Sequence, residues 1–267
     1  MSQHSAKFSH QPRKRFGQNF LTDDGVIDSI VSAIAPTSSD KLIEIGPGKG
    51  ALTEPLLQQC PALTVIELDR NLVTYLHALQ KRYPLLQIVQ DDVLDVDFTQ
   101  FASTRTLRVV GNLPYNISTP LLFHLLKFDS LLIDMHFMLQ NEVVDRMTAV
   151  PNSKAYGRLS VMVQYYAQVE KLFTVDASSF SPSPKVTSAI VRVTPRANPP
   201  CIARNEPLFA KIVMACFQMR RKTLRNSLRQ FAGDAMMADL DIDLSLRPEA
   251  LSVEDFVYLS NCFHSLN

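Results

Sequence analysis

Two short segments of the sequence combine residue types and spacings that can bind a ligand and act on it. The first, Glu44-Ile-Gly-Pro-Gly-Lys-Gly50, directly follows a β-branched segment. Its glycines allow a tight turn and let backbone N–H groups approach a ligand closely. Glu67 lies 21 residues after Gly46, where a carboxylate can accept hydrogen bonds from ribose hydroxyls. Gly46-x-Gly48-x-x-Ala51 also satisfies the dinucleotide fingerprint, so the pattern predicts a nucleotide-like cofactor but does not identify which one. The alternative is a purely structural turn.

The second segment is Gly111-Asn-Leu-Pro-Tyr-Asn116, which follows another β-branched segment. The exocyclic amine of adenine is a poor nucleophile because its lone pair is delocalised into the ring. The Asn112 side-chain oxygen and the Leu113 carbonyl, held by Pro114, can accept its N–H bonds and favour a pyramidal nitrogen that faces an electrophile. Tyr115 can stack on the adenine, which contributes roughly 1 to 3 kcal/mol. The alternative is a proline-stabilised strand exit in which Asn112 is a local cap.

Asp92 follows a third β-branched segment and can accept a hydrogen bond from an adenine amine of the cofactor. The neighbouring Asp91, Asp95 and Asp97 favour a solvated acidic loop instead. Asp92 is therefore a weaker candidate than Glu67.

The elements that must position these residues follow from hydrophobic periodicity. Strands are predicted at Lys41–Ile45, Leu63–Glu67, Leu86–Val89, Leu107–Gly111, Ile133–Leu139 and, antiparallel, Lys185–Val193. Helices are predicted at Ala51–Gln59, Asn71–Arg82, Pro120–Phe128, Asn141–Ala149, Leu159–Gln168, Pro207–Phe217, Gln218–Phe231 and after Ser252. Their alternation up to about residue 140 predicts βαβ units with a parallel sheet, in an α/β domain that extends over residues 1–195. The proline-rich segment 194–200 predicts a linker, and residues 196–267 predict a small all-helical domain.

Charge is distributed unevenly along the 267 residues, although the net charge is only +1. Bases predominate in residues 1–22 and 196–229, whereas residues 23–110 hold 12 acids against 7 bases and residues 230–267 hold 7 acids against one base. The asymmetry suggests a polyanionic partner, with solvated charged faces as the alternative. With 46% hydrophobic and 20% charged residues, the chain is too apolar for disorder.

The composition also bears on compartment and metal content. The four cysteines lack C-x-x-C spacing, so neither a zinc site nor a disulfide framework is indicated. A reducing cytoplasm fits this pattern. The first thirty residues lack the apolar run of a signal peptide, and no run of eighteen apolar residues could span a bilayer. We therefore expect a cytoplasmic protein with no metal and no membrane partner.

Seven segments in order carry a family resemblance that extends from Arg13 to about Leu228. They are Arg15-Phe-Gly-Gln-Asn-Phe-Leu21, the glycine loop, Glu67-Leu-Asp69, Asn112-Leu-Pro-Tyr115, Pro151-Asn-Ser-Lys-Ala-Tyr-Gly-Arg158, Phe180-Ser-Pro-Ser-Pro-Lys-Val186 and Arg220-Arg-Lys-Thr-Leu-Arg-Asn-Ser227. In these segments the chain resembles the bacterial small-subunit (16S) ribosomal RNA adenine N6,N6-dimethyltransferases, the kasugamycin-sensitivity methyltransferase family.

The resemblance implies S-adenosylmethionine as the methyl donor and a Rossmann-like methyltransferase sheet. The implied donor site comprises Asn19, Leu21, Gly46, Glu67, Asp92 and Asn112, and of these Asn19 and Leu21 come from the family pattern alone. The family pattern also implies that residues 16–21 form a lid over the donor and the target. Without the family pattern, the residues of this segment would indicate a basic tail. The family pattern lets Phe180 sandwich the target adenine with Tyr115, although an aromatic wedge under a proline-rich loop is an equal alternative.

A basic helix face is expected to bind RNA. On the helix predicted at Gln218–Phe231, the cations Arg221, Lys222, Arg225 and Arg229 fall within about a 100° arc, beside an apolar arc. A basic face beside a buried face suits phosphate contacts. A solvated face is the alternative.

Together these features predict dimethylation of the N6 amine of two adjacent adenosines in the hairpin near the 3′ end of 16S rRNA. The expected substrate is small-subunit rRNA in a partly assembled 30S subunit, and the expected enzyme is monomeric. Two alternatives remain: a methyltransferase of large-subunit rRNA or DNA, and a catalytically idle RNA-binding assembly or transcription factor. The intact Glu67, Asp92 and Asn112–Tyr115 argue against the idle version, and the arginine-rich helix favours the small-subunit enzyme.

Overall fold

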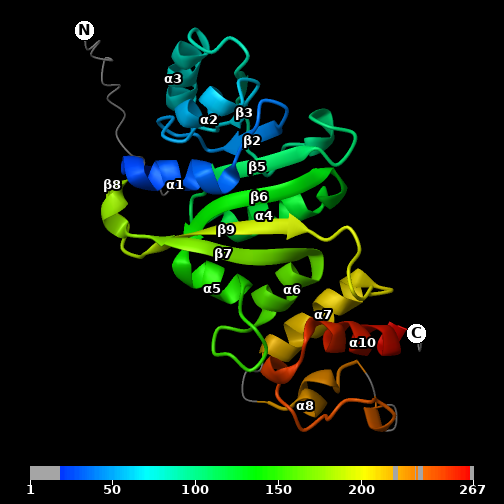
Figure 1. The fold of residues 1–267 in the computed structure, drawn as a ribbon. Helices are drawn as coiled ribbons and strands as arrows, with labels where there is room; N and C mark the ends of the chain where they lie inside the picture. Colours follow the sequence, from blue (N-terminus) through cyan, green and yellow to red (C-terminus); the bar gives the residue numbers. More distant parts are fainter. Residues whose placement is uncertain (1–18, 219–221, 232, 234–236, 265–267) are drawn as a thin grey trace. The chain divides into compact units, whose positions relative to one another are not determined.

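The chain divides into two compact units, which are described separately. The structure, a computed structural model, describes residues 19–218, 222–231, 233 and 237–264. Unit 1 comprises Met1–Asn141 and Glu170–Pro195, and unit 2 comprises Glu142–Val169 and Arg196–Asn267 (Figure 1). The change of unit after Pro195 coincides with the predicted domain boundary, whereas Glu142–Val169 groups with the C-terminal part of the chain. The roles assigned to the two predicted domains, 1–195 and 196–267, stay predictions.

A mixed sheet forms the centre of unit 1. Within the described residues its strand order is β4-β3-β2-β5-β6-β9-β7. The strands are β2 (Lys41–Ile45), β3 (Thr64–Ile66), β4 (Gln87–Val89), β5 (Leu107–Asn112), β6 (Leu132–Gln140), β7 (Ala167–Val175) and β9 (Ser188–Pro195). Strands β4, β3, β2, β5 and β6 pair in parallel, and β9 pairs antiparallel with β6. The predicted α/β class, the parallel sheet and the late antiparallel strand are confirmed.

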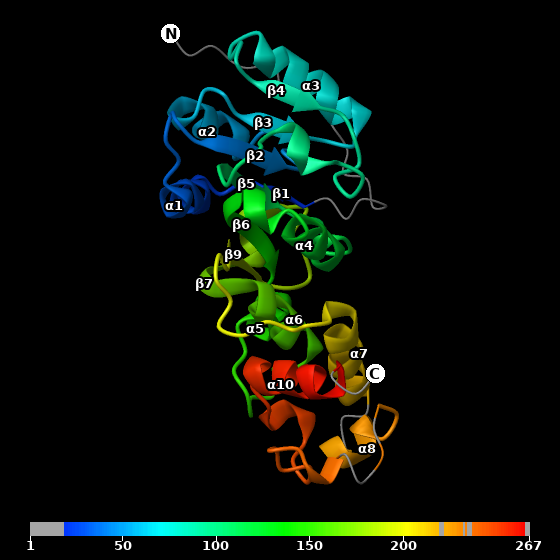
Figure 2. The same ribbon diagram turned by 90° about the vertical axis from the view of Figure 1, so that its right-hand side faces the viewer.

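Helices cover both faces of this sheet. They are α1 (Asp24–Ile34), α2 (Thr53–Gln59), α3 (Arg70–Gln80) and α4 (Ser118–Leu126). Figure 2 shows α1 and α4 on opposite sides of the central strands. The apolar residues of α1 to α3 join Val110 and Met138 of the sheet in one buried cluster. Capping is local and encoded in sequence: Asp23 accepts a hydrogen bond from the Val26 N–H at the start of α1, and Asp69 accepts one from Asn71 at the start of α3.

A two-stranded sheet in unit 1 joins the first described residues to a segment far along the chain. Strand β1 (Phe20–Leu21) pairs antiparallel with β8 (Phe180–Ser181). The Thr22 N–H donates to the Ser179 carbonyl at 2.9 Å, and the Ser179 hydroxyl donates to Asp23 at 3.1 Å. Strands of two residues carry no periodicity, so hydrophobic patterning did not predict this pairing. It also did not predict α1 or β7.

Unit 2 is helical. It contains most of α5 (Asn141–Met147), together with α6 (Arg158–Tyr166), α7 (Glu206–Gln218), α8 (Leu224–Leu228) and α10 (Val253–His264). A short 3-10 turn of unit 2 occupies Pro248–Ala250, and those of unit 1 occupy Phe98–Gln100, Asp129–Leu131 and Ala177–Ser179. The predicted cap of the last helix is confirmed, since the Ser252 hydroxyl accepts a hydrogen bond from the Asp255 N–H at 3.1 Å. No helix among the described residues is long and apolar enough to cross a membrane.

Two boundary predictions near unit 2 were wrong. The continuous helix predicted at Gln218–Phe231 is interrupted, because Thr223 is extended (φ −72°, ψ 163°) and α8 begins only at Leu224. The N–H groups of Leu224 and Arg225 instead donate to the carbonyls of Leu246 and Leu244, a long-range pairing that overrides the amphipathic pattern. The predicted linker also begins later than residue 194, because β9 continues through Pro195.

One arginine anchors the amino-terminal edge of the parallel strands. The Arg108 guanidinium donates to both carboxylate oxygens of Asp134 at 2.9 Å and to Asp40 at 2.8 Å. It also donates to the Ile34 carbonyl at 2.7 Å, which satisfies the C-terminus of α1. Because these partners come from α1, β6 and the segment before β2, the cluster fixes the end of the sheet opposite the glycine loop.

A buried histidine beside this cluster makes the fold sensitive to acid. His136 on β6 is 3% exposed, and neither ring nitrogen has a hydrogen-bond partner among the described residues. Burial lowers its pKa to about 4, against the opposing effect of nearby Asp134. The unfolded chain, in which the pKa is about 6.5, therefore binds a proton that the folded chain excludes between these two pH values. Stability contributed by neutral His136 is present above pH 6.5 and is lost as the pH falls toward 4.

We predict that His136→Met flattens the pH dependence of the unfolding free energy. Across the window from pH 6.5 to 4, the substitution should remove up to about 3 kcal/mol of acid destabilisation. Urea unfolding of both proteins at several pH values measures the effect as a difference in slope, independently of any constant change in stability. Parallel curves would contradict this assignment.

Candidate functional site

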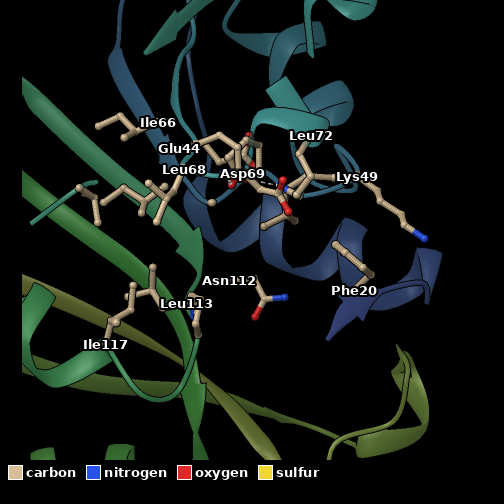
Figure 3. A pocket seen from close by; sticks show the side chains of 18 of the residues that line it. Phe20, Glu44, Lys49, Ile66, Leu68, Asp69, Leu72, Asn112, Leu113 and Ile117 are labelled. Atoms are coloured by element: carbon tan, nitrogen blue, oxygen red, sulfur yellow. Dashed lines mark hydrogen bonds between the residues drawn. The ribbon is translucent and has the colours of Figure 1, made fainter. Parts of the chain in front are cut away.

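The candidate site is an open cleft of about 180 Å³ at the carboxyl ends of the parallel strands of unit 1. Figure 3 shows the side chains that face it. The cleft brings together every predicted donor-site residue and the predicted adenine loop: Asn19, Leu21, Gly46, Gly48, Glu67, Asp92, Asn112, Leu113, Pro114 and Tyr115. These residues come from five separate segments of the sequence, so their convergence is a result of the fold.

The pairing of β2 with β5 places the glycine loop beside Asn112. The two strands are parallel, with Glu44 opposite Val110, so the segments that follow them leave the sheet at the same edge. Gly111 makes this possible, because a Cβ at this position would lie 2.6 Å from the Ile45 carbonyl oxygen. Only glycine permits such an approach without displacing a strand.

The glycine loop is held against Glu67. Gly48 has a φ of 59°, a left-handed conformation that favours glycine. Its N–H donates to Glu67 Oε2 at 3.4 Å, while Glu67 Oε1 accepts from the Asp69 N–H at 2.8 Å. Burial raises the pKa of Glu67, and these N–H groups oppose the rise. The carboxylate is thus fixed at the end of β3 with its position set by backbone donors.

Glu44 is a site residue that the sequence reasoning did not single out. It is 2% exposed and lines the cleft, and its Oε2 has no hydrogen-bond partner among the described residues. Burial raises the pKa of Glu44 to about 8, and the neighbouring Glu67 carboxylate adds to the rise. The signal was present in the sequence, because an acid inside the apolar strand Lys41–Ile45 needs a reason.

The side chain of Asn112 is oriented by the N-terminal segment. Its amide nitrogen donates to the Asn19 backbone carbonyl at 3.2 Å. Since a carbonyl can only accept, the nitrogen must face Asn19, and Oδ1 is the atom turned to the other side. Figure 3 shows the Asn112 amide projecting into the cleft, with its two polar atoms pointing in different directions. The residue therefore presents a fixed acceptor.

Leu113 to Tyr115 form a rigid continuation of β5. The Leu113 N–H donates to the Met138 carbonyl at 3.2 Å, which extends the pairing with β6 and fixes the peptide whose carbonyl follows. The Tyr115 hydroxyl forms a 2.8 Å hydrogen bond with the hydroxyl of Ser188, a fully buried residue at the start of β9. This contact fixes the position of the hydroxyl end of the half-buried Tyr115 side chain at the cleft.

Asp92 and Phe180 occupy different positions relative to the cleft. Asp92 lines it from the loop after β4, and its carboxylate accepts a hydrogen bond from the Leu94 N–H at 3.0 Å. Phe180 is 5% exposed and belongs to the apolar cluster that contains Leu21. It is not among the described residues that line the cleft. Its predicted stacking on the target base stays a prediction.

The predicted RNA-binding cations lie in unit 2. Arg225 and Arg229 are exposed at α8 and its C-cap, and Lys222 is exposed just before the helix. Arg221 lies outside the described residues. Among the residues that the structure describes, no group of three or more His, Cys, Asp or Glu side chains could hold a metal ion.

Comparisons with known proteins identify similar chains. The family model described as ribosomal RNA adenine dimethylase matches residues 9–265. Ribosomal RNA small subunit methyltransferase A of Chromohalobacter salexigens is 55% identical over 258 residues, which cover 95% of this chain and 92% of that protein. The protein of the same name from Saccharophagus degradans is 55% identical and covers 94% of each chain.

Solved structures show the same fold. A dimethyladenosine transferase from Plasmodium falciparum has a TM-score of 0.74 and 25% sequence identity, over 90% of this chain and 95% of that one. The 23S rRNA methyltransferase ErmE has a TM-score of 0.71 and 24% identity, over 92% of this chain and 100% of that one. This second likeness concerns the fold alone.

Proposed function

The chain belongs to the ribosomal RNA adenine dimethylase family, and we propose that it dimethylates the N6 amines of two adjacent adenosines near the 3′ end of small-subunit rRNA. It is an S-adenosylmethionine-dependent methyltransferase. The observation that carries the proposal is Asn112, whose acceptor oxygen is fixed beside a cleft lined by carboxylates. Its relatives are named as small-subunit methyltransferases, which supports the small subunit as the source of the substrate.

The residues of the cleft fit S-adenosylmethionine, which carries a cationic sulfonium and an ammonium group. Five carboxylates line the cleft among the described residues, those of Glu44, Glu67, Asp69, Asp91 and Asp92. One of these, Glu44, has an unpartnered buried oxygen, a position that a cationic or hydrogen-bonding group would satisfy. We assign Glu67 to the ribose hydroxyls, Asp92 to the adenine amine of the donor, and Asn19, Leu21, Gly46 and Gly48 to the enclosure of the donor.

The protein groups act mainly on the geometry of the acceptor amine. Asn112 Oδ1 and the Leu113 carbonyl accept hydrogen bonds from N6, which localises its lone pair and directs it toward the donor. The bound donor supplies an electrophilic methyl group. That methyl group would leave the donor with a neutral thioether as the leaving group, and N6 would then release a proton to water, so no strong base is needed. Acceptors matter most at this point because positive charge develops on the nitrogen.

Tyr115 holds the target base by stacking, with its hydroxyl end anchored to Ser188. Such stacking contributes roughly 1 to 3 kcal/mol per base. The target adenine must leave its own stack to enter the cleft, as unpaired loop bases can. Phe180 is proposed as a second residue that stacks on the target base. The alternative is a supporting role beneath the loop, which is consistent with the burial of Phe180 in the structure.

The wider setting of the reaction is also proposed. The exposed Lys222, Arg225 and Arg229, together with Arg221, bind rRNA phosphates. The substrate is rRNA in a partly assembled 30S subunit, and the enzyme acts as a monomer in the cytoplasm. The family supports an rRNA substrate, and the basic composition of residues 196–229 supports the phosphate contacts.

We predict that labelled S-adenosylmethionine will modify two adjacent adenosines near the 3′ end of small-subunit rRNA. The assay incubates the protein with immature small subunits or with free rRNA and then maps the modified nucleotides. Dimethyladenosine at both positions, formed more efficiently in the subunit, is the expected result. Label in large-subunit rRNA or DNA, or no transfer to any of these substrates, would refute the proposal.

Asn112→Ala should separate catalysis from donor binding. The lost acceptor acts on the transition state, so turnover should fall by at least about a hundredfold. Donor affinity, measured by calorimetry, should change only a few-fold. An equal loss of donor affinity and turnover would show instead that Asn112 serves the donor.

Glu67→Ala should weaken the donor itself. A hydrogen bond to a charged group contributes roughly 1.5 to 3 kcal/mol, so the donor dissociation constant should rise about ten- to hundredfold. Asp95→Ala is the matched control, because it removes an exposed carboxylate from the same acidic part of the chain. Equal donor affinities for the two variants would reject the ribose contact.

Replacing Arg225 and Arg229 together by glutamine should weaken RNA binding and reduce its salt dependence. Each lost phosphate contact removes somewhat under one unit of slope in a plot of log affinity against log salt. Donor affinity should stay constant, because the donor cleft is lined by residues of unit 1. Lys211→Gln, at an exposed position of α7, is the control. The same salt slope in the double variant and in the Lys211→Gln control would show that this face is solvated and does not contact RNA.

A further inference from the structure

Lys49 carries a charge opposite to that of the carboxylates that line the cleft. Five carboxylates line the cleft, and Lys49 is the one lysine or arginine among the described lining residues. It lies in the glycine loop between Gly48 and Gly50, both with positive φ, so its backbone position is set by the same turn that builds the donor site. An exposed cation at this place can bind an anion, and the proposed reaction offers two: the carboxylate of the donor and the phosphates of the RNA.

The ammonium group of Lys49 is held at the rim of the cleft. Its Nζ lies 4.6 Å from the centroid of the Phe20 ring, a cation–π geometry. Phe20 itself is 8% exposed and is fixed by the pairing of β1 with β8. Figure 3 shows the Lys49 side chain extending past Phe20 and away from Asn112 and Glu44. The charge is therefore oriented outward, toward an approaching ligand.

The described residues leave this ammonium available. Lys49 is exposed, and none of the ion pairs within the described parts of the chain includes it. A cation that is positioned by an aromatic ring but not neutralised by a carboxylate can bind an oxyanion without first breaking a salt bridge.

We propose that Lys49 binds a backbone phosphate next to the target adenosine as the base enters the cleft. This inference rests on the proposed function. A base that reaches Asn112 remains joined through its ribose to two phosphates, which stay at the mouth of the cleft. There they would face a lining rich in carboxylates, and Lys49 offsets that repulsion at the rim. Phe20 acts as a positioning residue that keeps the ammonium in place.

The test compares Lys49→Met, Lys49→Arg and Lys41→Met. Lys41 is an exposed lysine at the first residue of β2, the strand that leads into the glycine loop, so its variant controls for loss of one charge from unit 1. For Lys49→Met the KM for small-subunit rRNA should rise about tenfold, and the salt slope of RNA binding should fall by somewhat under one unit. The kcat at saturating RNA and the donor dissociation constant should stay within about twofold of wild type. Lys49→Arg should retain most of the RNA affinity because it keeps the charge.

Two outcomes would overturn the inference. If Lys49→Met and Lys41→Met show the same KM and salt slope, Lys49 does not contact RNA. If the donor dissociation constant rises while RNA binding is unchanged, Lys49 binds the carboxylate of the donor. Failure of the proposed function looks different, since wild-type protein would then leave small-subunit rRNA unmethylated, while the salt slope of RNA binding could still be compared among the variants.

Discussion

The parallel pairing of β2 with β5 is the constraint on which the site depends. It brings the glycine loop and Asn112 out of adjacent strands at one edge of the sheet. The separation of these strands is set by Gly111, where any side chain would collide with the Ile45 carbonyl. Donor binding and amine positioning therefore share one structural origin, and a change in the strand spacing would disturb both. The Arg108 cluster secures the opposite edge of the same strands, so the register is fixed at both ends.

The distribution of charged side chains in the cleft suits two ligands of opposite charge. A cationic donor favours carboxylates, whereas RNA is repelled by them. The structure places Glu44 and Glu67 deep in the cleft, 2% and 7% exposed, where burial raises the pKa of both. For Glu44 the pKa rises to about 8, which lessens its negative charge near neutral pH. The cation of the lining is exposed at the rim. The carboxylates thus lie deep in the cleft, toward the proposed position of the cationic donor, and the lysine lies at the rim, toward the proposed position of the RNA. Salt further screens the long-range repulsion between the carboxylates and RNA.

Local sequence patterns predicted the elements that carry the site, and long-range pairing accounts for what they missed. The strands before the glycine loop and before Asn112 were predicted at nearly their observed bounds, because β-branched runs that end in loop residues are local signals. The β1–β8 pairing depends on residues about 160 positions apart and leaves no periodic trace. Thr223 interrupts a predicted helix because the neighbouring N–H groups pair with the segment around Leu244. Glu44 was not predicted as a site residue, although an acid inside an apolar strand is a local signal.

The orientation of Asn112, the proposed catalytic amide, depends on this long-range pairing. Its nitrogen bonds to Asn19, which directly precedes β1, and β1 is aligned by Phe180 opposite Leu21. Phe180 and Leu21 are both buried in the same apolar cluster. Loss of the Phe180 ring would therefore loosen β1, release the Asn19 carbonyl and let the Asn112 amide rotate. A fall in activity on changing Phe180 follows from this route even without stacking on a base, so only binding of the target base itself separates the two roles.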